Sequence, residues 1–365
     1  MPRAYACYAR LARAVPLGDN KPGESGLDRR AFLSAAAACS VVSASSARYA
    51  RAQQPQHRFG EAIRYSADRN GAALIIVRHG IVLAEDYPGG PAAARWPIGA
   101  GTRAFTPLLA ASLINDRLMT LDEPVALTIG DWGAHPTKMI ISIRSLLSGA
   151  SGIGFGRGGP RDLAAAIAAE PRDPPGTRFI NDEAAYLVFV EIARRKLSAA
   201  GREPDPARYL TARTLLPIGC VPIGWLRGQD GAPRFDTGAA VSARGWAQAG
   251  ELIRREGVWR AQQIADANAL REAVRGSFAE PRAGFGLWLA APGRHRDDLD
   301  VDTDLWRGAS PAPIDLAMAE GAGGQRLYLS PSDGIVIARL ARSDDNAQWS
   351  DAQFLSLVWR DLARV

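Results

Sequence analysis

The sequence predicts an α+β fold in which an antiparallel sheet is built from both ends of the chain and flanked by helices, with a mostly helical subdomain inserted between them. Two observations support this. Strand patterns occur near the start, at 71–87, and near the end, at 325–341. Helical patterns fill the region between them. We therefore expect sheet parts at about 60–95 and 284–365 and a helical part at about 96–283.

The strand signals are short β-rich runs separated by turn residues. The segment 71–87 contains two such runs around His79-Gly80, which predicts a hairpin with His79 as a turn residue rather than a ligand. Further strands are expected at 284–290 and within 325–341. These runs supply the two ends of the predicted sheet.

The helical signals are apolar residues that recur at intervals of three and four. They predict helices within 105–124, 138–154, 161–170, 183–197, 238–259 and 352–365. The segment 291–315 is densely acidic and has no period, so we interpret it as a solvated surface loop. It lacks the glycine and the terminal glutamate of a calcium-binding loop, and the four histidines have no metal spacing. We expect neither a metal site nor a cofactor.

The net charge of +6 on 365 residues is concentrated in the first part of the chain. Residues 1–52 hold eight of the 44 Lys and Arg and three of the 38 Asp and Glu. The remainder therefore carries 36 basic and 35 acidic residues and is nearly neutral. A nearly neutral body gives no electrostatic footprint for nucleic acid.

Residues 1–52 have the features of a twin-arginine-type export signal. Arg29-Arg30 precedes a modestly apolar stretch from Ala31 to Ala44, and Ala50-Arg51-Ala52 is a small-x-small cleavage signal before Gln53. The stretch is too short to span a bilayer permanently, so we expect no transmembrane segment in the mature chain. An amphipathic N-terminal helix is the alternative. The signal predicts a periplasmic or secreted protein whose domain occupies 53–365.

The cysteines add little. Cys7 and Cys39 lie in the leader, so Cys220 is the one thiol of the mature chain and no internal disulfide can form. Cys39 as a lipid-modified residue is a weaker alternative to plain cleavage. Cys220 is expected to be a small core residue.

Five segments occur in an order that carries functional information. They are RWPIGAGTRAFTPLLAASLINDRLMTLDEPV (95–125), IISIRSLLSGASGI (140–153), PGTRFINDEAAYL (175–187), SARGWAQAGELIRREGVW (242–259) and GAGGQRLYLSP (321–331). This ordered set resembles the serine β-lactamase-like hydrolases, which include class C β-lactamases, penicillin-binding DD-peptidases, esterases and 6-aminohexanoate-dimer hydrolases. The resemblance covers about residues 60–365 and implies the β-lactamase/DD-peptidase-like fold.

The resemblance also implies acyl transfer by a serine, a lysine three residues on and a tyrosine. In this chain the serine position is Ala100, the lysine position is Arg103 and the tyrosine position is Asn181. Alanine offers no nucleophile, arginine stays protonated, and asparagine has no titratable proton. The three chemical groups are therefore replaced.

The surrounding pocket positions implied by the resemblance also differ. Glu183 takes the asparagine position of the tyrosine motif, and Glu320-Gly321 takes the third motif. Gly321 and Gly324 begin and end the GAGG run of that region. A buried arginine needs a partner, so we expect Arg103 to pair with Glu183 or Glu320.

Two functions from different classes follow. The first is a non-hydrolytic protein that binds a small molecule or a peptide or peptidoglycan-like ligand, or serves as an interaction module. The second is an active hydrolase of β-lactam, ester or amide bonds that uses unconventional residues. Thr102 lies about 200° around a helix from Ala100 and should not replace the serine. An exported domain without a small-molecule site is a third possibility.

Overall fold

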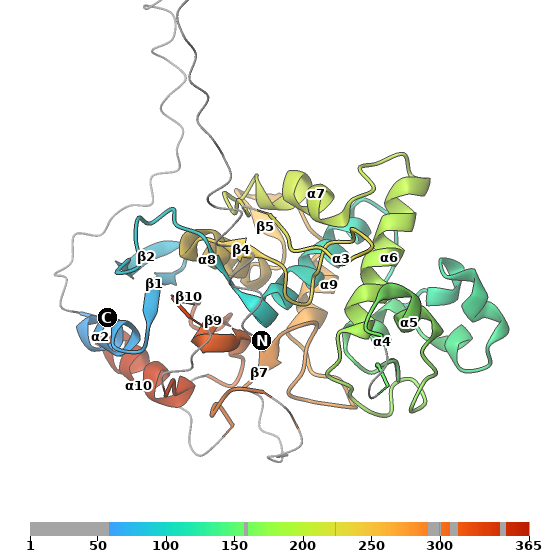
Figure 1. The fold of residues 1–365 in the computed structure, drawn as a ribbon. Coiled ribbons are helices and arrows are strands. Elements are labelled where there is room, and N and C mark those ends of the chain that lie inside the picture. The colour runs from blue at the N-terminus through green and yellow to red at the C-terminus, as the bar shows by residue number, and fades with distance from the viewer. Residues whose placement is uncertain are drawn as a thin grey trace, which may run out of the picture. The chain divides into compact units, whose positions relative to one another are not determined.

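The computed structural model describes residues 58–156, 160–222, 224–290, 299, 301–306, 313–343 and 348–364 (Figure 1). The predicted export signal and its boundary at residue 52 lie outside these residues and stay predictions. Most of the acidic segment 291–315 also lies outside them.

The sheet has six strands in the order β2-β1-β10-β9-β8-β7. Their bounds are β1 (Gly71–Arg78), β2 (Ile81–Asp86), β7 (Trp288–Leu289), β8 (Ala317–Gly321), β9 (Gln325–Ser330) and β10 (Ile335–Ala341). The first strand, β1, pairs antiparallel with the last, β10, with Ile76 opposite Ile337. The prediction that the two ends of the chain form one antiparallel sheet is confirmed.

Each face of the sheet packs against its own apolar cluster because successive side chains point to opposite faces. In β1, Ile75 and Val77 join one cluster and Leu74 and Ile76 join the other. The first cluster includes α8 (Ala243–Arg254), and the second includes α2 (Gly60–Ala67) and α10 (Asp351–Leu362). Figure 1 shows α2 and α10 together on one side of the sheet.

The other elements form the mostly helical part, as predicted, together with short strand pairs. They are η1 (Gly99–Ala104), α3 (Phe105–Asn115), η2 (Val125–Leu127), η3 (Gly130–Ala134), η4 (Lys138–Ile140), α4 (Ile143–Leu147), α5 (Leu163–Ala168), α6 (Ala184–Ala199), α7 (Pro206–Leu210), the π-helical η5 (Thr211–Leu215), α9 (Ala267–Ala273), η6 (Ala322–Gly324), β3 (Trp96–Pro97) with β4 (Ala240–Val241), and β5 (Val258–Trp259) with β6 (Gln262–Gln263).

Two expected elements are shorter than predicted. The helix expected within 105–124 ends at Asn115, because Arg117 takes a left-handed conformation (φ 59°) that ends the helix. The strand expected over 284–290 pairs only at Trp288–Leu289, because Gly286 (φ 72°) turns the chain just before it.

The expectation of a solvated surface loop over 291–315 agrees with the exposed side chain of Asp302 and is wrong for Asp304, which is half-buried and hydrogen-bonded. Asp304 accepts hydrogen bonds from the Ser350 hydroxyl and, at 3.0 Å, from the backbone N–H of Ala352. The carbonyl of Asp302 accepts from Arg326. The Asp304 contacts attach the segment to the start of α10, and the Asp302 contact attaches it to β9. Cys220 is buried in the core, as predicted.

Candidate functional site

Ala100 lies at the start of η1, which runs directly into α3. Thr102, two residues on, is fully buried: its hydroxyl donates to the carbonyl of Gly99 (2.6 Å) and accepts from the N–H of Ala239 (3.0 Å). Gly101 has no room for a side chain, since a Cβ there would lie 2.7 Å from the Trp246 ring. Thr102 therefore secures η1 to the segment before β4 and does not supply a replacement hydroxyl.

Arg103 makes a contact that the sequence did not predict. Its Nη1 donates to Oδ1 of Asn181 at 2.7 Å, and its guanidinium carbon lies 5.0 Å from the centre of the Tyr186 ring. Among the residues that the structure describes, Arg103 forms no ion pair with Glu183 or Glu320, so that expectation is wrong. The lysine and tyrosine positions of the resemblance nevertheless meet, joined here by an amide hydrogen bond.

Glu183 already has other partners. It directly precedes α6, and its carboxylate accepts from Nε of Arg161 at 2.7 Å. Arg234 approaches the same carboxylate at 3.6 Å. These two guanidinium groups satisfy the charge that Arg103 was expected to balance.

Glu320 faces a different arginine. It stands opposite Arg326 in the register of β8 and β9, with 4.0 Å between its Oε2 and Nη1 of Arg326. Burial raises the pKa of the Glu320 carboxyl, and the positive charges of Arg326 and Arg103 act in the opposite direction. Its side chain is only 13% exposed, so it contributes little to an open surface.

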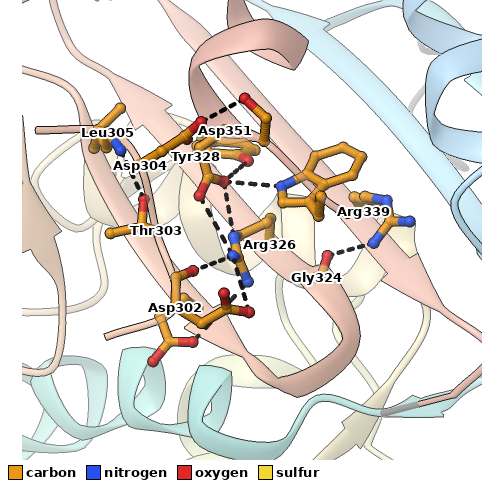
Figure 2. A network of polar contacts seen from close by, with 12 residues as sticks. Asp302, Thr303, Asp304, Leu305, Gly324, Arg326, Tyr328, Arg339 and Asp351 are labelled. Atoms are coloured by element: carbon orange, nitrogen blue, oxygen red, sulfur yellow. Dashed lines mark hydrogen bonds and ion pairs between the residues drawn. The ribbon is translucent and has the colours of Figure 1, made fainter. Parts of the chain in front are cut away.

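Gly321 and Gly324 are places of close packing. Gly321, the last residue of β8, lies against the carbonyl of Ile98 just before η1. Gly324 (φ 77°) is so close to Arg339 that a Cβ would lie 2.5 Å from its Nη1. Arg339 also donates a hydrogen bond to the Gly324 carbonyl at 2.6 Å, which holds its side chain in this position (Figure 2).

A pocket lies beside Arg103, with an empty volume of about 410 Å³ that includes space open to solvent. Its polar lining comes from Arg103, Ser148, Asn181, Asp182 and Tyr186. Its apolar lining includes Leu146, Leu147, Phe179, Leu287 and Trp288. Two of the three replaced positions, Arg103 and Asn181, thus line it, whereas Ala100, Glu183, Glu320, Gly321 and Gly324 do not.

Sequence reasoning missed Tyr186 as a site residue. It belongs to the predicted helix 183–197, where an aromatic side chain reads as core, and only the fold brings its ring beside Arg103. Burial raises its pKa, partly offset by the charge of Arg103, so the phenol stays protonated at neutral pH. The available signal was its position: in a helix that starts near residue 183, residue 186 lies in the first turn, close to Asn181.

Asp182 also lines the pocket, but its carboxylate is fully used. Oδ1 accepts from the N–H groups of Ala184 (2.9 Å) and Phe155 (3.3 Å), and Oδ2 lies 3.4 Å from Nη2 of Arg161. It therefore orients the segment before α6 and its charge is balanced locally.

Within the described ranges, no group of three or more His, Cys, Asp and Glu side chains could hold a metal ion. In the same residues, no helix is long and apolar enough to cross a membrane.

Comparisons with known proteins agree with the fold. The Beta-lactamase family model matches residues 59–356. A penicillin-binding protein homologue from Caulobacter crescentus is similar in structure, with a TM-score of 0.63, 15% identity and coverage of 84% of this chain and 98% of that chain. A family VIII carboxylesterase is also similar in structure, with a TM-score of 0.61, 15% identity and coverage of 84% of this chain and 98% of that chain.

A β-lactamase from Mycobacterium bovis is a third similar structure, with a TM-score of 0.58, 16% identity and coverage of 84% of this chain and 98% of that chain. The comparison with curated proteins found no match. Identities this low establish the fold alone, but the family model spans most of the chain. Together with the end-to-end sheet and the five ordered segments, this match places the chain in the Beta-lactamase family.

Proposed function

We propose that this chain is an exported, non-hydrolytic member of the Beta-lactamase family that binds an organic ligand in the pocket beside Arg103. The single observation that carries the proposal is the replacement of the attacking serine by Ala100, at the start of η1. A methyl group cannot form the acyl-enzyme on which the chemistry of the family depends. The nearest hydroxyl along the chain, on Thr102, is buried in two hydrogen bonds.

The residues that would assist a serine are also changed. Arg103 is permanently charged and cannot accept a proton as a tuned lysine does. Its hydrogen bond to Asn181 fills the place where a proton would pass between lysine and tyrosine. The pocket itself persists, which supports binding without turnover.

A hydrolase is the second candidate because Ser148 is one of the residues that line the pocket. The Ser148 hydroxyl donates to the carbonyl of Ser145 at 3.3 Å, and no described residue forms a hydrogen bond that would remove its proton. An activated serine needs such a base within hydrogen-bond reach. This absence makes the hydrolase the weaker candidate.

The two candidates separate in one experiment. The purified protein is incubated with nitrocefin, p-nitrophenyl acetate and a fluorescent penicillin, and its intact mass is measured for an acyl adduct. We expect no turnover above the buffer rate and no adduct. Turnover or an adduct that disappears in Ser148→Ala would replace the proposal with the hydrolase.

Export is part of the proposal and rests on Arg29-Arg30 and the cleavage signal before Gln53. Fusing residues 1–60 to a reporter that is active only after folded export tests it. Arg29→Lys with Arg30→Lys should abolish export, and N-terminal sequencing of the exported protein should begin at Gln53. Export that survives the double substitution would reject a twin-arginine route.

A further inference from the structure

Among the described residues, no carboxylate lies within ion-pair distance of Arg103, and its interaction with the Glu320 carboxyl acts over a longer range. Arg103 forms one hydrogen bond, to the neutral amide of Asn181, and a contact with the Tyr186 ring. Other arginines around it have carboxylate partners: Arg161 has Glu183 at 2.7 Å and Arg234 has Asp236 at 2.6 Å. A guanidinium without a carboxylate, in a partly enclosed site, favours an incoming anion.

Two further donors stand beside it. Because Asn181 uses Oδ1 to accept from Arg103, its amide NH₂ is left to donate, and Asn181 is exposed. The Tyr186 phenol lines the same pocket and forms no hydrogen bond with any described residue. The pocket lining thus includes three donor groups, which match the acceptor oxygens of a carboxylate.

Other residues that line the pocket are apolar. Phe179 and Trp288 meet edge to face, with 5.8 Å between ring centres, and Leu146, Leu147 and Leu287 continue the apolar surface. Apolar walls with a few placed polar groups are the usual composition of a small-molecule site. This pocket therefore suits a flat apolar body that ends in a negative group.

Two carboxylates act against an anion, and neither cancels Arg103. Asp182 is held by two backbone N–H groups and Arg161. Glu320 lies outside the lining and its nearest arginine is Arg326, with 4.0 Å between Oε2 and Nη1. The remaining positive field in the pocket is that of Arg103.

We propose that this pocket binds small aromatic carboxylates, with the carboxylate on Arg103, the Asn181 amide and the Tyr186 phenol and the ring against the apolar surface formed by Phe179 and Trp288. This inference rests on the proposed function, because it names the ligand class of the same pocket. It assigns Arg103 a new role, as the anchor for an anion in place of a proton-transfer group.

The test compares phenylacetate with phenylacetamide, which has the same shape and no charge. Both are titrated into the purified protein by calorimetry and by NMR. We expect phenylacetate to bind at least about tenfold more tightly, since a charge-assisted pair is the main difference. Raising the salt concentration should reduce the difference in affinity between phenylacetate and phenylacetamide, because salt screens the charge of Arg103. Equal affinity, or no binding of either probe, would overturn the inference.

Arg103→Gln removes the charge and leaves a shorter, neutral polar side chain. It should lower phenylacetate affinity about tenfold and leave phenylacetamide affinity unchanged. Arg244→Gln is the matched control, because Arg244 also lies over a tyrosine ring, Tyr87, but already pairs with Glu85 at 2.6 Å outside the pocket. An equal loss in both variants would contradict a specific anchor.

Two failures stay distinguishable. An acyl adduct with penicillin would reject the proposed function whatever phenylacetate does. Absence of both adduct and charge preference would reject the carboxylate inference and leave the non-hydrolytic assignment in place. If Arg103→Gln does not fold, by circular dichroism, the charge preference and salt dependence of the unmodified protein still decide.

Discussion

Two arginines of this protein, Arg326 and Arg103, lie in regions with opposite demands. Arg326, on strand β9, is fully buried and accompanied by Asp351 at 2.8 Å (Figure 2). It also donates to the carbonyls of Gly321 and Gln325, each at 3.1 Å. Arg103 borders a pocket and has one neutral acceptor. A buried guanidinium must be satisfied within the protein, whereas one that reaches a pocket can await a ligand.

Asp351 shows how complete the first region is. Its carboxylate accepts from Arg326, from the Tyr328 hydroxyl and, at 2.9 Å, from Nε1 of Trp349. Asp351 is also the first residue of α10, so this network of Arg326, Tyr328, Trp349 and Asp351 attaches the last helix to the sheet. The difference teaches that the protein satisfies a guanidinium completely where it supports the fold and leaves one with fewer partners where it borders a pocket.

The largest effect is expected from Asp351→Asn, which removes the nearest counter-charge of the buried Arg326 and leaves only the more distant carboxylates of Asp302 (3.8 Å) and Glu320 (4.0 Å). Removing one member of a buried ion pair costs about 3–5 kcal/mol. Urea unfolding should register this loss. Glu85→Gln, which breaks the more exposed pair with Arg244, is the control and should cost less than about 1 kcal/mol. Similar losses in the two variants would deny the network its special role.

Acid should weaken the same network. Burial by itself would raise the pKa of Asp351, but the charge of Arg326 and the hydrogen bonds from Arg326 and Tyr328 outweigh it and hold the pKa below its usual value. A carboxyl whose pKa is lowered on folding stabilises the fold above its unfolded pKa, about 4, and loses that contribution as pH falls through the folded pKa.

The free energy of unfolding of the unmodified protein should therefore fall more steeply below about pH 4 than that of Asp351→Asn. Unfolding curves between pH 7 and pH 2.5 measure both slopes. Parallel slopes would mean that Asp351 does not titrate differently in the two states.

An effect of intermediate size is expected at Gly286, which lines the pocket beside Arg103. Gly286 (φ 72°) passes so close to η1 that a Cβ would lie 2.5 Å from the carbonyl oxygen of Arg103. Gly286→Ala should cost about 1–3 kcal/mol through strain and displace the wall of the pocket. Gly176→Ala is the control, since Gly176 also has a positive φ but has nothing within 4 Å of its Cβ position. Equal losses would assign the cost to φ alone.

The fold was predictable because it depends on patterns that the chain repeats over many residues. The pairing of β1 with β10 followed from apolar runs at both ends, and the motif order added the family. The partners of Arg103 were not predictable, because they depend on which side chains 78 or more residues away reach it first. The sequence offered Glu183 as a partner for Arg103, but in the structure Glu183 forms ion pairs with Arg161 and Arg234.

Arg103→Gln should have little effect on stability, in contrast to changes at Arg326. Arg103→Gln gives up one exposed hydrogen bond, worth about 0.5–1.5 kcal/mol, and Asn181 can bond to water in its place. We expect a change within about 1 kcal/mol by urea unfolding. Arg326→Gln, which leaves Asp351 without its guanidinium, should lose several times more, about 3–5 kcal/mol. A large loss at Arg103 would make it a structural residue.

The smallest effect on the stability of the fold is expected from a triple variant, Ala100→Ser with Arg103→Lys and Asn181→Tyr. This variant also tests the geometry of the pocket. The triple variant restores the three groups implied by the family. We expect it to fold, because the substituted side chains are partly or fully exposed. Labelling by fluorescent penicillin should nevertheless be weak, since Glu183 and Glu320 keep partners suited to the present pocket and the supporting contacts of a lysine base are missing. Strong labelling would mean that the cleft beside η1 has kept its catalytic geometry and that activity was lost through the three side chains alone.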